Sequence, residues 1–334
     1  MWLYTKALRP SQLIKKLPKI ANPTAVFYSK DGLLASAENA RLDFVNQIVE
    51  LLQDFGYSCV LVDGSSMDAP HICSDIALHI WMMEKPADCP PRSDLFHVFP
   101  SYLRGFWYFD TDGVRNNSSL KSGAFQPARM SKDWSKKVFA DLRSRFVETG
   151  QTKFDQSPVG KFAPPKDCIT VAVQSFAKPK FYDTYVQYPD LIHAAIEARG
   201  HRPIAIKPHP MLNHRAIDQL LGLHDPENGV FVEPYNLHEL LSVSHCVVTR
   251  CSAVAVEAML HRVPAIVAGE VDFRHCVTTI RDAADLRSAI DAVTERHIPY
   301  EKFLTWFFTQ ELFQPKNKAK SRERMASLLG LSDT

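Results

Sequence analysis

The segment 204–210 combines an ammonium group and an imidazole at the end of an apolar run. It reads Ile-Ala-Ile-Lys-Pro-His-Pro, so Lys207 and His209 lie two residues apart and Pro210 restricts the turn that follows. Residues two apart on an extended chain point to the same side. A cation and a hydrogen-bond donor aimed into one space can bind a phosphate oxygen. The segment therefore predicts a phosphate site, although a single histidine after a strand is more often a packing residue.

A second segment, 247–269, has the same order of apolar run, polar turn and helix-like pattern. Ser252 is expected at the N-cap of the helix, where its hydroxyl and the amides from Ala253 onward can hold phosphate oxygens. Arg250 comes just before the cap, and Glu257 lies inside the helix. A serine here would by itself indicate only a helix cap, and it is the combination with the first segment that indicates a ligand site.

The elements that must position these segments alternate between strands and helices. The expected strands are 168–174, 203–206, 229–232, 245–249 and 264–267, and the expected helices are 185–199, 213–221, 236–242, 253–260 and 282–294. This alternation predicts a parallel, doubly wound sheet. Gln174, Glu233 and Tyr235 also follow strands, so they are expected at the same edge of the sheet as His209.

The N-terminal half also has an α/β pattern. Strands are expected at 25–28, 59–62, 76–81 and 95–98, a helix at 37–55 and a charged helix at 131–146. The segment 150–165, rich in Gly, Pro, Gln and Ser, is expected to be the interdomain linker. The fold class is thus predicted as α/β, with two Rossmann-like domains facing a central cleft, the architecture of GT-B glycosyltransferases. The expected domains are an N-terminal α/β domain at 1–160 on the acceptor side and a C-terminal α/β domain at 161–300 that binds the nucleotide-sugar donor. A helical segment, 301–334, is expected to cross back to the N-terminal domain.

Composition limits the other function classes. The chain has 334 residues, 46% of them hydrophobic, and a formal net charge of +2, which provides no strong general attraction to nucleic acid. The longest apolar runs are far below the ~20 residues of a membrane span, and no signal-peptide pattern is seen. Seven dispersed cysteines indicate reduced thiols. A cytoplasmic protein is expected, and its basic ends, 1–19 and 316–324, leave a peripheral inner-membrane contact open beside packing on its own domain.

Taken together, these motifs resemble the capsule polysaccharide synthesis family, which includes the bacterial β-Kdo transferases. The resemblance covers about residues 165–310. It rests on Lys-Pro-His-Pro at 207–210, Glu-Pro-Tyr-x-x-x-x-Leu-Leu at 233–241, and Thr-Arg-x-Ser-x-x-x-x-Glu-Ala-x-x-x-x-Val-Pro-x-x-x-x-Gly at 249–269. It implies a cytoplasmic glycosyltransferase of surface polysaccharide or lipopolysaccharide synthesis that uses CMP-Kdo.

A patch at 106–114, Phe-Trp-Tyr-Phe-Asp-Thr-Asp-Gly-Val, is similar to the aspartate-and-glycine segment of the same family. The resemblance implies retention of configuration, for which a double displacement needs a carboxylate nucleophile. Asp110 matches that position and Asp112 is the alternative. Strand alternation would point both side chains the same way. Without the resemblance, Asp110 to Gly113 would indicate only a surface turn.

The resemblance also implies roles for the other polar residues. His209 and Ser252 would hold the CMP phosphate, and Lys207 or Arg250 would offset its charge. Near the nucleoside, the implied residues are Gln174, Glu233 and Tyr235. Lys30 and Arg104 are assigned to the sugar carboxylate or the acceptor glycan. No cofactor or metal is expected, since a CMP-sugar carries a single phosphate; the partners are this donor and a glycan or glycolipid acceptor.

Three alternatives stay open at this point. A CDP-glycerol glycerophosphotransferase would use a similar site but is expected to have an aspartate near Ser252, where this chain has Arg250 and Cys251. A sialyltransferase would share the handling of CMP and differ in the sugar pocket. A noncatalytic polysaccharide-assembly subunit would keep the fold and bind nucleotide without turnover.

Overall fold

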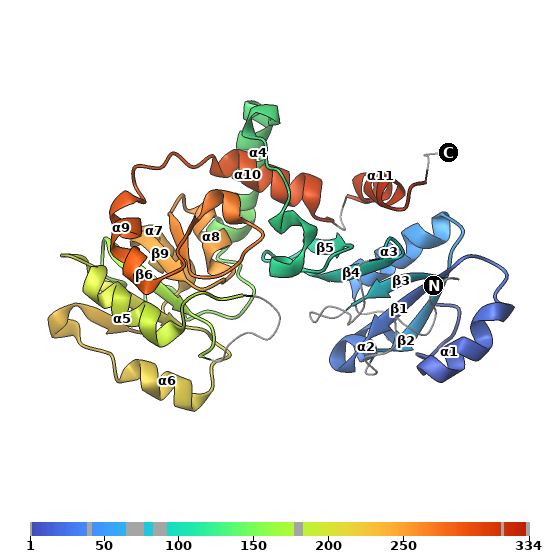
Figure 1. The fold of residues 1–334 in the computed structure, drawn as a ribbon, viewed down its shortest axis with the longest axis horizontal. Helices are drawn as coiled ribbons and strands as arrows, with labels where there is room; N and C mark the ends of the chain where they lie inside the picture. Colours follow the sequence, from blue (N-terminus) through green and yellow to red (C-terminus); the bar gives the residue numbers. More distant parts are fainter. Residues whose placement is uncertain are drawn as a thin grey trace. The chain divides into compact units, whose positions relative to one another are not determined.

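The chain folds into two α/β units in the computed structural model (Figure 1). Unit 1 comprises Met1–Ser101, Gly105–Ser119 and Phe308–Thr334, and unit 2 comprises Tyr102–Arg104 and Leu120–Phe307. The structure describes residues 2–38, 42–64, 77–82, 92–176, 183–314 and 317–331. The loops 64–75 and 84–94, where acceptor recognition would be expected, lie almost wholly outside the described residues.

Unit 1 is built on a five-stranded sheet with the order β2-β1-β3-β4-β5. The strands are β1 (Thr24–Ser29), β2 (Ser58–Asp63), β3 (Ala77–Trp81), β4 (Leu95–Pro100) and β5 (Trp107–Asp110). The first four are parallel, and β5 runs antiparallel to β4 with Asp110 opposite His97. The helices are α1 (Pro10–Lys16), α2 (Asp31–Glu38), α3 (Asp43–Asp54) and α11 (Lys318–Leu328).

Helices α3 and α1 bury their apolar residues in two separate clusters of unit 1. Phe44, Ile48 and Leu52 of α3 recur at helical spacing and pack with the Phe27 side of the sheet. Leu13 of α1 belongs to the other cluster, which also includes Val26, Tyr28 and Val60. The N-terminal segment thus packs on its own unit, which was the alternative to a membrane contact. In the described part of the chain, no helix is both long and apolar enough to span a bilayer.

Unit 2 contains a six-stranded, fully parallel sheet with the order β11-β10-β9-β6-β7-β8. Its strands are β6 (Cys168–Val173), β7 (Ile204–Pro208), β8 (Val230–Val232), β9 (Ser244–Thr249), β10 (Ala265–Val267) and β11 (Thr278–Thr279). Its helices are α4 (Lys132–Arg143), α5 (Tyr188–Ala198), α6 (His214–Leu221), α7 (Leu237–Val243), α8 (Val254–Leu260), α9 (Leu286–Ala292) and α10 (Tyr300–Trp306).

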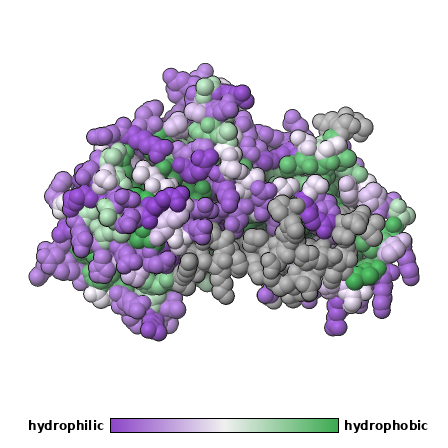
Figure 2. Space-filling model, viewed as in Figure 1, coloured by the Kyte–Doolittle hydropathy of each residue, from purple (hydrophilic) through white to green (hydrophobic). Residues whose placement is uncertain are grey.

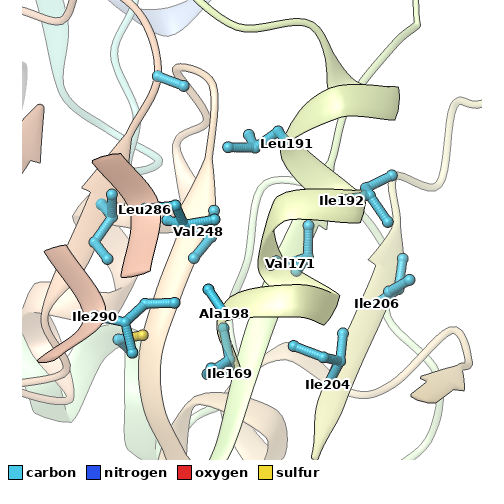
Figure 3. Close-up of a cluster of buried hydrophobic side chains, with 14 of the residues drawn as sticks. Ile169, Val171, Leu191, Ile192, Ala198, Ile204, Ile206, Val248, Leu286 and Ile290 are labelled. Carbon is cyan, nitrogen blue, oxygen red and sulfur yellow. The ribbon is translucent and has the colours of Figure 1, made fainter. Parts of the chain in front are cut away.

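The two faces of this sheet are filled differently. Alternate residues of β6 and β7, such as Val171 and Ile206, meet Leu191 of α5 and Leu286 of α9 in a large apolar cluster (Figure 3). The opposite face carries the smaller cluster of Cys168, Ala205, Tyr235 and Leu240. Lys207 follows Ala205 by two residues in β7, so its side chain leaves the sheet on this second face. The surface over α5 and α6 is largely hydrophilic (Figure 2).

The segment expected to link the domains, 150–165, groups with unit 2, and the chain passes from unit 1 to unit 2 near residue 120 instead of 160. The segment 150–165 groups with unit 2 because its few apolar side chains pack there. Phe162 packs against the smaller apolar cluster, and the backbone N–H of Gly160 donates to the Glu239 carboxylate at 2.8 Å. The C-terminal segment groups with unit 1 from Phe308 onward.

Candidate functional site

The carboxyl ends of β10, β9, β6, β7 and β8 lie side by side at one edge of the unit 2 sheet. Because all these strands are parallel, the residues that follow them meet at that edge. Gln174, His209, Glu233, Ser252 and Gly269 each come from a different one of the five loops. The sequence prediction that these positions share an edge is therefore confirmed by the strand order.

His209 is held in a defined orientation directly after β7. Its backbone N–H donates to the carbonyl of Val173 at 2.9 Å, and its carbonyl accepts from Leu212 at 3.0 Å, which closes a turn with Pro210 in the second position. Its Nδ1 accepts the N–H of Met211 at 3.1 Å. Burial, aided by Lys207 and Lys153, lowers the pKa of the imidazole. His209 is therefore neutral at pH 7, with the proton on Nε2.

The Nε2–H of His209 forms no hydrogen bond with any residue that the structure describes, although the ring is half-buried. The ring edge is fixed by Phe154, whose centroid lies 4.7 Å away at 76°. A neutral imidazole with one nitrogen bonded to the backbone and the other open is a fixed donor. This group can donate to an anionic oxygen.

Lys207 is buried, with 7% of its surface exposed, and so is Glu257 of α8, with 5%. The Lys207 ammonium donates to the carbonyl of Tyr235 at 2.5 Å. Burial lowers the pKa of Lys207 to about 8, opposed by Glu257, and burial raises the pKa of Glu257 to about 8, opposed by Lys207 and Lys153. Lys207 thus braces the loop after β8 and contributes positive charge next to His209.

Lys153 and Phe154 were missed by sequence reasoning because their segment has the composition of a linker. Lys153 acts electrostatically on both His209 and Glu257. Arg104, an expected sugar or acceptor residue, is exposed and donates from Nη2 to the carbonyl of Lys153 at 2.9 Å. The sequence feature that could have marked this loop as part of the site is a lysine followed by an aromatic residue, Lys153-Phe154, in an otherwise polar stretch.

Arg250 is engaged with the neighbouring loops. Its guanidinium donates to the Ser175 carbonyl at 2.6 Å and to Oε1 of Gln187 at 3.1 Å, and it lies 4.3 Å from the Tyr188 ring centroid. Only 2% of Arg250 is exposed. A side chain with these contacts positions the loops after β6 and β9.

Ser252 lies one residue before the N-cap of α8, which is Ala253. Because Ala253 already has helical angles, the start of the helix lies within one residue of the expected N-cap, Ser252. The Ser252 hydroxyl is buried and accepts the Val254 N–H at 3.3 Å. Beside it, the Cys251 thiol donates to Oε1 of half-buried Gln174 at 3.7 Å.

Glu233 and Tyr235 differ in accessibility. Tyr235 is buried in the apolar cluster with Cys168 and Leu240, and burial raises the pKa of its phenol. The ring is therefore part of the core, and the group of Tyr235 that interacts with Lys207 is its backbone carbonyl. The Glu233 carboxylate is half-buried at the end of β8 and forms no hydrogen bond or ion pair within the described ranges.

Gly269, after β10, permits a close approach of backbone segments. A Cβ at this position would lie 3.0 Å from the Asp183 carbonyl oxygen and 3.2 Å from that of Arg250. The neighbouring Glu270 N–H donates to Asp183 at 2.9 Å. Close packing of these backbone segments therefore explains why the motif at 249–269 ends in glycine.

In unit 1, Asp110 ends β5 and organises the loop that follows. Its carboxylate accepts from the backbone N–H groups of Asp112 (2.8 Å), Gly113 (3.2 Å) and Ser119 (3.1 Å), and from the Ser119 hydroxyl (2.6 Å). Only 8% of Asp110 is exposed. A Cβ on Gly113 would lie 2.8 Å from the Asn117 carbonyl, which explains the glycine.

Asp112 lies outside the strand and is exposed, so the two aspartates do not point the same way as alternation predicted. The turn that Asp110 caps ends the strand at residue 110. The one hydrogen bond described for the Asp112 carboxylate comes from the Thr111 hydroxyl at 3.3 Å. Lys30 is exposed at the end of β1. Within the described ranges, no three His, Cys, Asp or Glu side chains are grouped for a metal ion.

Comparison with known proteins places the fold. No family model and no curated protein sequence matches the chain. Among solved structures, it is similar to the KpsC β-Kdo 2,7 transferase of Thermosulfurimonas dismutans, with 12% identity, a TM-score of 0.55, and coverage of 91% of this chain and 99% of that one. The KpsC β-Kdo 2,4 transferase of the same organism has 13% identity, a TM-score of 0.50, and coverage of 86% and 90%.

These similarities, together with the two sheets, establish a GT-B-like fold of two Rossmann-like units. The wall teichoic acid polymerase TagF is also similar, with 13% identity, coverage of 96% of this chain and 93% of that one, and a lower TM-score of 0.34. At these identities the likeness concerns the fold, and the residues of the site must carry any functional argument.

Replacing Asp110 by Asn should destabilise unit 1 by about 2 kcal/mol or more, because the amide nitrogen cannot accept the hydrogen bonds that the charged oxygen accepts. Asp112→Asn is the matched control and should change stability by less than about 0.5 kcal/mol, since its carboxylate is exposed. Urea unfolding of both variants measures the difference. Equal stabilities would show that the hydrogen bonds of Asp110 contribute nothing to the fold.

Glu257→Gln should remove a pH dependence of stability. From pH 6.5 to 8 the folded chain holds a proton on Glu257 that the unfolded chain has lost, so stability falls as pH rises through this window. The slope for one proton is at most about 1.4 kcal/mol per pH unit. Lys207 has a depressed pKa and opposes this only as pH approaches 8.

Differential scanning calorimetry of the wild type and Glu257→Gln across this window measures the effect. The variant should give the flatter profile and the higher melting temperature at pH 8. Glu227→Gln, at an exposed position, should leave the profile unchanged. A wild-type profile that rises from pH 6.5 to 8 would contradict the assignment of a proton to Glu257.

Proposed function

We propose that the protein is a glycosyltransferase that uses a nucleotide-linked sugar, with CMP-Kdo as donor and a surface polysaccharide or glycolipid as acceptor. The observation that carries the proposal is the open Nε2–H of His209 at the carboxyl edge of the unit 2 sheet. The GT-B-like fold is consistent with it, because ligands of open α/β sheets bind at that edge. The donor assignment rests on the resemblance of the motifs around His209, Glu233 and Ser252.

In the proposed reaction the site stabilises the phosphate of CMP as it leaves the sugar. As the sugar leaves CMP, negative charge grows on the phosphate oxygens, and a fixed donor that needs no reorganisation lowers the barrier. In the proposal His209 donates to one of these oxygens from Nε2. Lys207 and Lys153 supply positive charge in a partly buried region, where screening by water is weaker than at the surface.

The remaining unit 2 residues divide into contacting and positioning roles. Glu233, Gln174 and Ser252 are proposed to contact the nucleotide, since they extend from the loops that flank His209. Arg250 and Glu257 are proposed as positioning residues. The first fixes the loop of Ser175, and the second lies close enough to Lys207 to interact with it electrostatically.

For the transfer itself we propose retention through a carboxylate, with Asp110 as nucleophile and Asp112 as the alternative. Asp110 would attack the anomeric carbon, form a glycosyl ester and release CMP. The oxygen of an acceptor hydroxyl would then displace the carboxylate and lose its proton to water, which regenerates the Asp110 carboxylate. The hydrogen bonds from Gly113 and Ser119 support this by fixing the oxygens. They also occupy lone pairs that a nucleophile needs, whereas Asp112 is exposed.

Binding of CMP tests the donor site. Isothermal titration should give a micromolar dissociation constant for CMP and weaker binding of CDP and UDP. His209→Ala should weaken CMP binding at least tenfold, because a hydrogen bond to a charged group is worth about 1.5–3 kcal/mol. The exposed His193→Ala on α5 is the matched control and should bind CMP normally. Preference for UDP, or CMP binding that survives His209→Ala, would refute the proposal.

Transfer from CMP-Kdo tests the nucleophile. Asp110→Asn should lower kcat by about a thousandfold or more, and Asp112→Asn by less than tenfold. Ser119→Ala is the control for loop damage, because it removes one hydrogen bond to Asp110 and leaves the carboxylate in place. If Ser119→Ala loses as much activity as Asp110→Asn, or if Asp112→Asn is the inactive variant, Asp110 is not the nucleophile.

A further inference from the structure

Strand β4 of unit 1 carries a buried histidine, His97, that forms no side-chain hydrogen bond with the Asp110 loop. Only 4% of the residue is exposed, and neither ring nitrogen is hydrogen-bonded to a residue that the structure describes. Most buried polar side chains in proteins have at least one hydrogen-bond partner. The position of His97 in the sheet indicates which group its imidazole can serve.

Strand pairing places His97 between β3 and β5, which flank β4 in the sheet (Figure 1). Trp81 of β3 is the partner of His97 on one side, and Asp110 of β5 is its partner on the other. This row is level with the end of β3, which is Trp81, and close to the end of β1, which is Ser29. The carboxyl ends of parallel strands are where open α/β sheets bind their ligands.

The side chains of this row share one face of the sheet. Leu95 and Trp81 belong to the apolar cluster on the α1 side, and Leu95 precedes His97 by two residues in β4. Directly opposite residues of an antiparallel pair project from the same face, so Asp110 lies beside His97. Asp112, in the exposed turn that follows β5, interacts with His97 electrostatically. The imidazole thus lies between a tryptophan and the loop that carries both aspartates.

The imidazole of His97 is neutral at pH 7. Burial lowers its pKa to about 4, and the negative charge of Asp112 opposes this shift. One ring nitrogen therefore carries a lone pair that can accept a proton. A base of this strength is sufficient where the attacking oxygen becomes acidic as its new bond forms, and carboxylates of similar pKa act as such bases in glycoside hydrolysis.

We propose that His97 is the general base of the second displacement, a role that rests on the proposed transfer through Asp110. The acceptor oxygen bonds to the anomeric carbon, and the unprotonated ring nitrogen of His97 takes the hydroxyl proton. The ester bond to Asp110 breaks in the same step, and its electrons return to the carboxylate. The imidazolium then gives the proton to water. The first displacement, in which Asp110 releases CMP, needs no base.

The test uses CMP-Kdo as donor and compares methanol with sodium azide as acceptor, with sodium chloride as the control for ionic strength. Methanol must lose a proton when it attacks, whereas azide is an anion and needs no base. With methanol, His97→Gln should release CMP in a stoichiometric burst and then turn over at least about a hundredfold more slowly than the wild type. Intact-protein and peptide mass spectrometry should find the sugar accumulated on Asp110. Azide should restore most of the turnover.

His79→Gln is the matched control, because it makes the same change in β3, two residues before Trp81 and farther from the carboxyl end of that strand. His79 is also buried, and its Nδ1 is hydrogen-bonded to the Tyr28 hydroxyl at 2.9 Å. Its replacement should lower stability in urea unfolding. It should slow both displacements alike, without an accumulated adduct and without rescue by azide.

His97 is not the base if the wild type forms the adduct but His97→Gln neither accumulates it nor responds to azide, and the proposed transferase then stands without it. If the wild type forms no adduct on Asp110, the proposed nucleophile is wrong and the role of His97 is refuted with it. His97→Asn provides the same measurements if His97→Gln does not fold.

Discussion

The candidate donor site depends on the hydrogen bond from the buried ammonium group of Lys207 to the Tyr235 carbonyl. The Lys207 side chain emerges from β7 on the face of the sheet that carries α7 and α8, and it interacts electrostatically with Glu257. The hydrogen bond to the Tyr235 carbonyl replaces part of the hydration that this cation loses on burial. One side chain thereby ties β7 to the loop after β8 and to α8, and His209 begins its turn two residues later.

The alternation of strands and helices in unit 2 was predictable because each element buries a continuous apolar face, which leaves a clear period in the sequence. The expected strands 203–206 and 245–249 correspond to β7 and β9 within one or two residues. The antiparallel direction of β5 was not predictable, since strand direction depends on partners far along the chain. The grouping of 150–165 with unit 2 was missed for the same reason: its attachment depends on a few contacts, such as Gly160 with Glu239.

The edge of the sheet that holds the candidate site was predictable, but the roles of individual side chains were not. Motif spacing places Arg250 and Tyr235 at that edge, yet Arg250 braces two loops and the Tyr235 ring packs inside the apolar cluster. The motif gives the position of a residue, whereas its role depends on which neighbours consume its hydrogen-bonding capacity. Lys153 and Phe154 show the converse, since no motif marks them and the fold places them at His209.

Whether a side chain has unused hydrogen-bonding capacity thus says more about its role than its residue type or its position in a motif. The Asp110 carboxylate has the residue type of a catalytic group, but the groups of its own loop already fill its lone pairs, so any reaction at Asp110 must first release some of them. His209 is fixed through Nδ1, and its Nε2–H forms no hydrogen bond with the residues that the structure describes. A ligand oxygen that accepts from Nε2 of His209 would therefore meet a donor whose orientation is already fixed by the Met211 N–H, so the hydrogen bond would form without reorganising the loop after β7.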